Sequence, residues 1–354
     1  MTDLEKLCSR VTEAADCAVI TDDVNRRYFT AMKSSAGTLV VFPEKAYFII
    51  DFRYIEKAKK TVTACEVILQ DKLYEQINSL IEKHGAKTVC VNADTCTLSE
   101  LIAYQQKLNA EVIADTKLAE IIREIRTVKS KEQIDKIIKA QRIAEKGFAH
   151  MLDFIKVGRT EKEIQLELDY YMLKNGAEAL SFDTIALSGS NTSLPHGVPS
   201  DKKVESGEFV LMDFGATYDG WHSDMTRTVC VGKPSDKMKS VYETVLTAQL
   251  SALDAVKAGM PGKALDKIAR DIITEAGYGD NFGHSLGHGV GVEIHESPYA
   301  SPSREDILPE NSIVTVEPGI YLEGKFGVRI EDFVVVTENG CINMTKAPKE
   351  LICL

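Results

Sequence analysis

Two aspartates within one predicted β-hairpin constrain the fold of this chain more than any other feature. Residues 211–232 read LMDFGATYDGWHSDMTRTVCVG and alternate as strands around an Asp-Gly pair, which is typical of two-residue hairpin loops. With that loop, Asp213 pairs with Thr226, and Asp224 lies on the same face as Asp213. A three-residue loop would instead put the two carboxylates on opposite faces. Burying both is costly unless something compensates their charge.

A second predicted hairpin carries a second pair of acids. Residues 312–336 read SIVTVEPGIYLEGKFGVRIEDFVVV and turn around Gly324. Centring the loop there places Glu317 opposite Glu331, with Arg329 on the same face. The Pro-Gly pair after Glu317 could add a bulge, so the register is approximate.

Four carboxylates on inward strand faces require a counter-charge. Like charges a few ångströms apart raise one another's pKa values and destabilise a fold. Two divalent cations would balance four carboxylates, and paired carboxylates are typical of two-metal hydrolytic sites. A single acid on a strand face would be interpreted as solvated, but the matching pairs on two hairpins favour a metal centre.

The histidines support a metal centre. His284 and His288 lie in FGHSLGHGVGVEIHESP, where the glycines exclude a regular helix and indicate backbone crowding around a site, with His288 as a nitrogen ligand. VGVEIH alternates like a strand and directs His295 to the side of Glu293. His196 lies in the Pro/Gly-flanked loop TSLPHGVPS, a usual location for functional groups. We interpret the remaining three of the seven histidines, at 84, 150 and 222, as structural or surface residues.

The chain of 354 residues is too long for one typical core, so we expect two domains. Apolar strands at 38–43 and 46–51 and an amphipathic helix at 73–84 indicate an α/β domain over residues 1–124. A capping box begins a long helix at Ser130. Residues 125–354 then read as an α+β domain with a largely antiparallel sheet.

Charge and composition exclude several functional classes. The net charge of −11 disfavours nucleic-acid and anionic-membrane surfaces. No apolar run approaches the roughly 18–20 residues of a membrane span. The eight cysteines are scattered without a disulfide or metal spacing, which favours a cytoplasmic location.

Four motifs together resemble the pita-bread metallopeptidases, in the branch of the Xaa-Pro aminopeptidases and Xaa-Pro dipeptidases (prolidases). They are MDFGATYDGWHSDMTRT, GHSLGHGVGVEIHE, TVEPGIY and GVRIED, in that family's order. Residues 1–120, around DVNRRYFT and YFIIDFRYIEKA, resemble the family's creatinase-type N-terminal domain. The resemblance implies a creatinase-type α/β domain followed by an α+β pita-bread catalytic domain.

The resemblance also implies roles for particular residues. It makes Glu317 the proton acceptor, His196 and His295 contacts to the scissile carbonyl, His284 a pocket residue, and Arg329 an orienting group for the metal-binding acids. Two divalent ions are expected, Mn²⁺ first, with Co²⁺, Fe²⁺ or Zn²⁺ as alternatives. A proline-containing peptide is the expected substrate and a homodimer the expected assembly. The implied metal ligands are Asp213, Asp224, His288, Glu317 and Glu331.

The same resemblance leaves the type of Xaa-Pro peptidase open. Prolidases hold the dipeptide's free carboxylate with an arginine shortly after the motif histidine, and here that place holds Tyr299, with Arg304 later. We therefore place an Xaa-Pro aminopeptidase ahead of a dipeptidase. A methionine aminopeptidase normally lacks the N-terminal domain, and a creatinase-like amidinohydrolase does not keep the ligands. A non-catalytic peptide-binding or protein-binding module usually loses ligands, and all five are present here.

Overall fold

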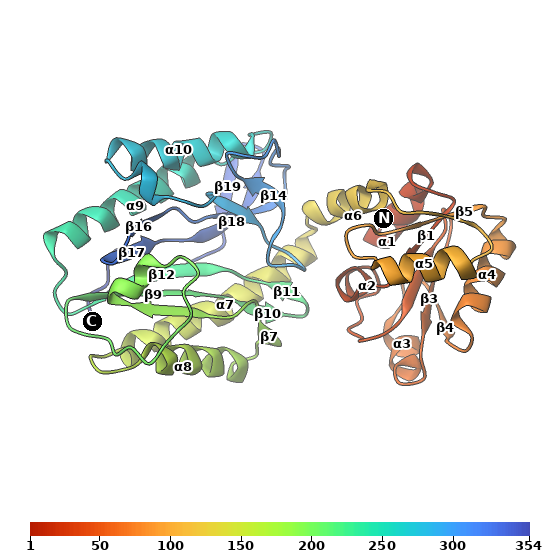
Figure 1. The fold of residues 1–354 in the computed structure, drawn as a ribbon, viewed down its shortest axis with the longest axis horizontal. Coiled ribbons are helices and arrows are strands. Elements are labelled where there is room, and N and C mark those ends of the chain that lie inside the picture. The colour runs from red at the N-terminus through yellow and green to blue at the C-terminus, as the bar shows by residue number, and fades with distance from the viewer. The chain divides into compact units, whose positions relative to one another are not determined.

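The computed structural model describes residues 1–354 and divides the chain into two compact units (Figure 1). Unit 1 is Met1–Arg126 and unit 2 is Thr127–Leu354. The sequence places the boundary between residues 124 and 125, two residues earlier. Each unit has hydrophobic clusters of its own. No helix is both long enough and apolar enough to span a membrane.

Unit 1 is built on one six-stranded mixed sheet, which confirms the predicted α/β class. The strand pairs β3–β4, β1–β5 and β5–β6 are parallel, whereas β1–β2 and β2–β3 are antiparallel. The strands, in sheet order, are β4 (Glu66–Leu69), β3 (Ala46–Ile50), β2 (Thr38–Val41), β1 (Cys17–Ile20), β5 (Thr88–Val91) and β6 (Glu111–Ile113).

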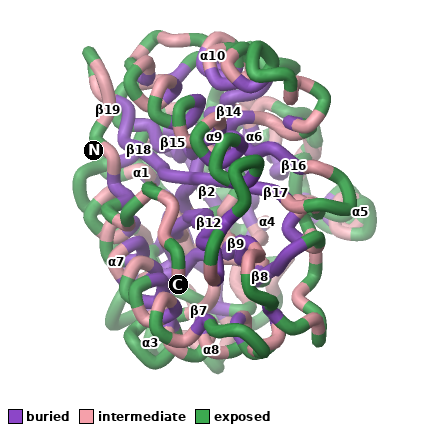
Figure 2. The backbone as a smooth tube through the Cα atoms, turned by 90° about the vertical axis from the view of Figure 1, so that its left-hand side faces the viewer, coloured by how far each residue is buried: buried purple, intermediate pink, exposed green.

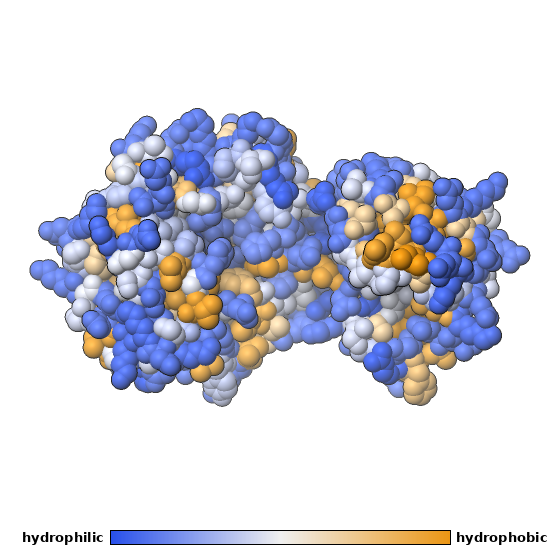
Figure 3. Space-filling model, in the orientation of Figure 1, coloured by the Kyte–Doolittle hydropathy of each residue, from blue (hydrophilic) through white to orange (hydrophobic).

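Helices pack on both faces of this sheet, so its central strands are buried throughout. On β2, Leu39 and Val41 belong to one apolar cluster and Val40 to the other, as the two-residue period of a strand requires. Figure 3 shows apolar side chains gathered around α5, where Leu98 is 72% exposed and Ile102 is 45% exposed. The helices are α1 (Asp3–Arg10), α2 (Asp23–Thr30), α3 (Ile55–Thr61), α4 (Leu73–His84), α5 (Leu98–Lys107) and α6 (Lys117–Thr127), with the 3-10 turn η1 (Val11–Glu13) after α1.

Four long helices cover the strands of unit 2. The Ser130 hydroxyl accepts from the Gln133 amide and so caps the first of them, as the sequence predicts. Thr160 caps the second helix in the same way. These helices are α7 (Lys131–Phe154), α8 (Glu161–Lys174), α9 (Asp236–Ala255) and α10 (Gly262–Glu275).

The strands of unit 2 pair antiparallel, which confirms the predicted α+β class, and they are largely buried behind the exposed outer faces of the helices (Figure 2). Short 3-10 turns, η2 (Gly189–Ser193) and η3 (Gly279–Asn281), interrupt the connections. The first group of strands comprises β7 (Ala179–Leu180), β8 (Ile185–Ser188), β9 (Glu208–Phe214), β10 (Ala216–Tyr218), β11 (Trp221–His222) and β12 (Met225–Val231). The second group comprises β13 (Gly287–Gly289), β14 (Glu296–Ala300), β15 (Ile313–Val316), β16 (Gly319–Leu322), β17 (Phe326–Arg329), β18 (Asp332–Thr337) and β19 (Gly340–Asn343).

The first hairpin has the predicted two-residue loop and register. Asp213 pairs with Thr226, and the loop residues Asp219 and Gly220 have φ values of 50° and 82°. Positive φ at both central positions is the geometry that an Asp-Gly hairpin turn requires. Asp213 and Asp224 therefore lie on the same face of the ribbon.

The second hairpin also keeps its predicted register. Gly319 pairs with Arg329 and Val316 pairs with Asp332, so the pairing is the same on both sides of Pro318 and no residue is inserted. The strands are interrupted between these pairs. Glu317 and the residue opposite it, Glu331, fall in that interruption.

One predicted strand is wrong. In the segment 290–295, Val290 has no regular structure and residues 291–295 form a run of bends, and the strand β14 begins only at Glu296. The Gly291 amide donates to the Glu293 carbonyl, and the Gly291 carbonyl accepts from the His222 amide. These contacts bend the segment despite its alternating sequence, so His295 reaches its position from a loop.

Candidate active site

A cavity of about 490 Å³ in unit 2 brings together every residue that the sequence nominates as functional. Its wall draws on both hairpins, on the loop before β9 and on the glycine-rich segment around β13. The nominated residues that line it are His196, Asp213, Asp224, His284, His288, His295, Glu317, Arg329 and Glu331.

The donor atoms of three buried residues lie close enough to bind one metal ion. The ligand atoms of Asp224, His288 and Glu331 all lie within 4.8 Å of one another. His288 Nε2 is 3.6 Å from Asp224 Oδ2 and 3.3 Å from Glu317 Oε1. The two interrupted hairpins thus present carboxylates to one imidazole nitrogen.

His288 is held in the orientation that a metal ligand needs. Its Nδ1 lies 3.0 Å from the carbonyl oxygen of Gly289, so Nδ1 carries the proton and Nε2 faces the acids. A backbone carbonyl on the other ring nitrogen is the usual partner of a metal-binding histidine. The His288 amide is fixed in turn by Thr315 Oγ1 at 3.0 Å.

Two buried carboxylate oxygens of the cavity residues lack any hydrogen-bond donor. They are Asp213 Oδ1 and Glu331 Oε1. The other oxygen of each group is bonded, Asp213 Oδ2 by Arg329 Nη2 and Glu331 Oε2 by Thr226 Oγ1 at 2.8 Å. Buried oxygens without donors are costly, and a bound cation would satisfy them. This donor set, rich in carboxylate and with one imidazole, fits divalent metal ions.

The neighbouring carboxylates of the cavity disfavour one another's ionised forms. Burial, and then the neighbouring Asp213 carboxylate, raise the pKa of Asp224 well above its usual range. Burial also raises the pKa of Glu331 well above its usual range, followed by the charges of Asp224 and Glu317. Burial raises the pKa of Asp213 too, although Arg329 opposes it. The protein alone therefore does not stabilise all these negative charges.

Glu317 and His288 form an ion pair, and their attraction shifts both pKa values in the direction opposite to the effect of burial. Burial would raise the pKa of Glu317, but the hydrogen bond and charge of His288 lower it to about 2. Burial would lower the pKa of His288, but Glu317 raises it to about 9. A histidine binds a metal ion as the neutral imidazole. Metal binding at Nε2 would therefore displace the proton that His288 Nε2 carries in the ion pair with Glu317.

A chain of hydrogen bonds connects Arg329 to His284. Arg329 Nη1 donates to the Tyr321 hydroxyl at 2.7 Å, and that hydroxyl lies 2.9 Å from His284 Nε2. His284 Nδ1 lies 2.8 Å from the Ser285 carbonyl, so Nδ1 is the protonated nitrogen and Nε2 accepts from Tyr321. Burial lowers the pKa of His284, which keeps the ring neutral. Both ring nitrogens are hydrogen-bonded within the protein. A ligand in the cavity would therefore contact the ring of His284 and not its nitrogens.

His295 and His196 line the cavity from two different loops. The ring centroid of His295 is 4.4 Å from that of His288, edge to face. Burial lowers the pKa of His295, so its imidazole is neutral near pH 7. His196 lies on the segment between η2 and β9 and is exposed.

The sequence does not identify several other wall residues. Most of them belong to the segment around β8 or to the glycine-rich segment, and nothing in the sequence distinguishes them from ordinary core or loop residues. Tyr299 does line the cavity, and the guanidinium carbon of Arg304 lies 4.1 Å from its ring centroid. The other wall residues are Phe182, Asp183, Ile185, Pro195, Ser285 and Gly287.

Comparison with known proteins places this site in a family. Residues 135–338 match metallopeptidase family M24, and residues 4–128 match the creatinase/prolidase N-terminal domain. The chain belongs to metallopeptidase family M24. It is therefore an enzyme of the metallopeptidase class, and the two matches confirm the family expected from the motifs.

Relatives of the M24 chain are similar over nearly their whole length. The Xaa-Pro dipeptidase of Pyrococcus furiosus is 40% identical over 352 residues, covering 99% of both chains. The solved structure of an Xaa-Pro dipeptidase from Bacillus anthracis is 42% identical with a TM-score of 0.96, covering 99% of both chains. The solved structure of an X-Pro aminopeptidase from Thermotoga maritima is 39% identical with a TM-score of 0.91, covering 96% of this chain and 98% of that one.

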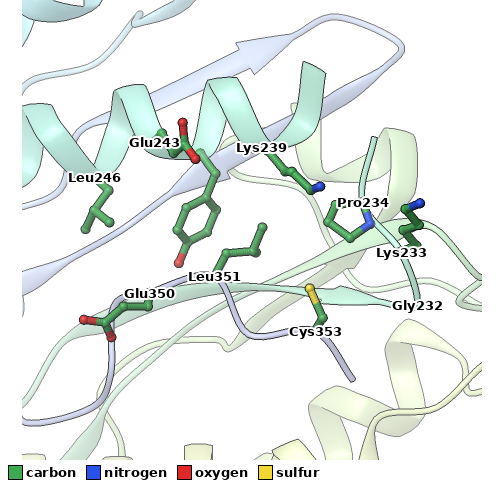
Figure 4. A pocket seen from close by; sticks show the side chains of 10 residues that line it. Gly232, Lys233, Pro234, Lys239, Glu243, Leu246, Glu350, Leu351 and Cys353 are labelled. Atoms are coloured by element: carbon green, nitrogen blue, oxygen red, sulfur yellow. The ribbon is translucent and has the colours of Figure 1, made fainter. Parts of the chain in front are cut away.

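A second cavity in unit 2, of about 660 Å³, differs chemically from the M24 site. It lies between α9 and the C-terminal segment (Figure 4). No histidine lines it, so it lacks the mixed donor set of the first cavity. Its walls are formed by Gly232, Lys233, Pro234, Lys239, Tyr242, Glu243, Leu246, Glu350, Leu351 and Cys353.

Proposed function

We propose that this chain is a divalent-metal-dependent Xaa-Pro peptidase, and specifically an Xaa-Pro dipeptidase. The observation that carries the proposal is the clustering of Asp224, His288 and Glu331, together with buried oxygens of Glu331 and of Asp213 that have no hydrogen-bond donor. The names of the P. furiosus and B. anthracis relatives favour the dipeptidase. These names favour the dipeptidase over the aminopeptidase, whereas Tyr299 favours the aminopeptidase when the sequence is considered alone.

In the proposed site, five side chains hold the metal ions and the remaining polar groups act on the substrate. Divalent ions bound there supply Lewis-acid polarisation of the carbonyl and a water of lowered pKa. The carboxylate-rich set with one imidazole favours Mn²⁺, with Co²⁺, Fe²⁺ and Zn²⁺ as alternatives. The proposed ligands are Asp213, Asp224, His288, Glu317 and Glu331.

Glu317 is the proposed general base. Its carboxylate lines the cavity, with Oε1 3.3 Å from His288 Nε2, so it lies where it can accept a proton from the attacking water. The proton then passes to the nitrogen of the leaving proline. Neutral His295 has an N–H to donate to the developing oxyanion, and His196 is the proposed second donor. Arg329 orients Asp213 through its hydrogen bond.

The cavity suits a short peptide that contains proline. Its volume of about 490 Å³ lies within the range of small-ligand sites. Phe182, Ile185 and Pro195 provide an apolar wall for the pyrrolidine ring or the preceding side chain. The bond before proline is a tertiary amide without an N–H, so the site needs no acceptor for that proton.

An Xaa-Pro aminopeptidase is the second candidate, and Tyr299 favours it. A tyrosine cannot neutralise the free carboxylate of a dipeptide as an arginine does. The T. maritima relative is named as an X-Pro aminopeptidase. Against this candidate, Arg304 contacts the Tyr299 ring and so places a positive charge next to this wall residue.

Steady-state kinetics with Mn²⁺ separate these candidates. We expect Ala-Pro to be hydrolysed with a kcat/KM at least about tenfold above that of Ala-Pro-Ala, and Met-Ala to be inert. A preference for Ala-Pro-Ala would support the aminopeptidase. If neither proline peptide is cleaved and purified protein retains no divalent metal, the proposed function is wrong and a non-catalytic module remains.

A further inference from the structure

A completely buried carboxylate lies outside the metal cluster. Glu161 is the first residue of α8, has 0% exposure, and accepts six hydrogen bonds from five donor groups. Its Oε1 accepts from Ser188 N at 2.7 Å, Ser188 Oγ at 3.1 Å and Asn191 Nδ2 at 3.0 Å. Its Oε2 accepts from Asn191 Nδ2 at 3.2 Å, Ser200 N at 3.0 Å and Ser200 Oγ at 2.6 Å.

These donors lie at the two ends of one loop. Ser188 ends β8 and Asn191 belongs to η2, whereas Ser200 follows the Pro/Gly segment that carries His196. The backbone of α8 reinforces the closure, because the Lys162 amide donates to the Ser200 carbonyl at 3.0 Å. One carboxylate thus holds together the start and the end of the loop 188–200.

The tip of this loop has few other supports. Leu194 is 54% exposed and Val198 is 80% exposed, so neither side of His196 is buried in a core. Near the tip, Arg329 Nη1 is 3.5 Å from the Pro195 carbonyl. The first part of the loop has a further anchor, because the hydroxyl of the buried Thr192 accepts from the Gly327 amide at 2.8 Å. The position of His196 therefore depends on these anchors before the tip and on the contacts of Ser200 after it, and Glu161 is the group that joins the two sides.

The donor pattern requires a carboxylate. All the donors are uncharged, and the N-terminal end of α8 favours a negative charge at this position. A glutamine would replace one acceptor oxygen by an NH₂ group that faces N–H donors. Repulsion there would release one end of the loop.

We propose that Glu161 is a positioning residue for His196, which it places against the substrate carbonyl by closing the loop 188–200. The inference rests on the proposed function, because it assigns His196 a role in the transition state. Glu161 itself does not line the cavity.

Kinetics of Glu161→Gln test this inference. We expect kcat for Ala-Pro to fall about 10- to 100-fold with KM within about threefold, since the lost contact belongs to the transition state. Bound Mn²⁺ should be unchanged, because Glu161 contacts no candidate ligand. Glu167→Gln is the matched control: it lies on the same helix and replaces a carboxylate that is hydrogen-bonded to His150 (2.6 Å), but should keep full activity.

A double-mutant cycle with His196→Ala distinguishes positioning from general destabilisation. If Glu161 acts through His196, Glu161→Gln should cost less than about threefold in the His196→Ala background. An equal loss in both backgrounds would overturn the inference. If Glu161→Gln folds poorly, Ser200→Ala removes one donor and should give a smaller loss of kcat in the same direction.

Hydrogen exchange gives a readout that does not need activity. In Glu161→Gln the amides of residues 188–200 should exchange at least about tenfold faster, with the rest of unit 2 unchanged. Unchanged exchange in this loop would refute the inference even for an active enzyme. A wild-type protein inactive on every Xaa-Pro peptide would refute the proposed function instead, and the exchange result would still decide whether Glu161 orders the loop.

Discussion

At the residue scale, the buried Asp224 carboxylate lowers the stability of the metal-free protein and is also a proposed metal ligand. It is 4% exposed, and burial and Asp213 both disfavour its ionised form. Removing its charge should therefore increase the stability of the metal-free protein. For Asp224→Asn we expect the melting temperature in chelator to rise by about 2–4 °C, equivalent to about 1 kcal/mol.

The same substitution should weaken metal binding by about 100-fold or more, because an amide is a poorer ligand than a carboxylate. Titration with Mn²⁺ followed by calorimetry measures this affinity. A variant that is less stable in chelator yet binds Mn²⁺ normally would show that Asp224 is a structural residue. Asp135→Asn, at an exposed position of α7 and away from the cavity, controls for the loss of an acid.

Glu317 gives the second prediction at this scale. Glu317→Gln keeps the shape of the side chain but cannot accept a proton, so kcat for Ala-Pro should fall by about 10³-fold or more. Circular dichroism should remain that of the wild type, since the glutamine fills the same space. Activity within tenfold of the wild type would refute the assignment of Glu317 as the base.

At the element scale, the interrupted hairpin depends on a glycine opposite Asp224. A Cβ atom on Gly215 would lie 1.9 Å from the Ser223 carbonyl oxygen, so any side chain would push the two strands apart. Gly215→Ala should cost about 1–3 kcal/mol of folding free energy. It should also lower the Mn²⁺ affinity, because Ser223 precedes Asp224.

Gly283→Ala is the matched control for this substitution. A Cβ on Gly283 meets no atom within 4 Å, and the residue has no positive φ. Urea unfolding should show no loss of stability in Gly283→Ala. Equal losses in both variants would mean that the close approach at Gly215 does not determine the strand geometry.

The hairpins were predictable because short-range chemistry fixes their register. An Asp-Gly turn specifies a two-residue loop, and the two-residue period of the strands then fixes which side chains face the cavity. The same two-residue period wrongly predicted a strand at residues 290–295. The sequence alternates there, but a backbone hydrogen bond with His222 holds the segment in a bent conformation. Tyr321 was missed because its role depends on a contact with His284, which approaches its hydroxyl from a non-strand segment 37 residues earlier in the chain.

At the scale of the whole molecule, the chain is two units with separate cores, and only one of them carries the candidate metal cluster. The apolar clusters on the unit 1 sheet contain no residue of unit 2. Metal binding should therefore stabilise unit 2 directly, since a ligand that binds only the folded state raises its stability. At free metal about 1,000 times the dissociation constant, the gain is about 4 kcal/mol.

The single tryptophan makes this prediction measurable on the intact chain. Trp221 is 7% exposed on β11, beside the first hairpin loop, so its fluorescence reports the unfolding of unit 2. Adding EDTA should lower the midpoint of the tryptophan transition by about 10 °C, given about 2–4 °C per kcal/mol for a unit of this size. Hydrogen exchange of the β1 and β2 amides, which reports unit 1, should change little. At the same free metal the EDTA effect should shrink to about a third or less in Asp224→Asn, because its affinity is expected to be about 100-fold lower. An effect of equal size in that variant would mean that the stabilising metal binds elsewhere.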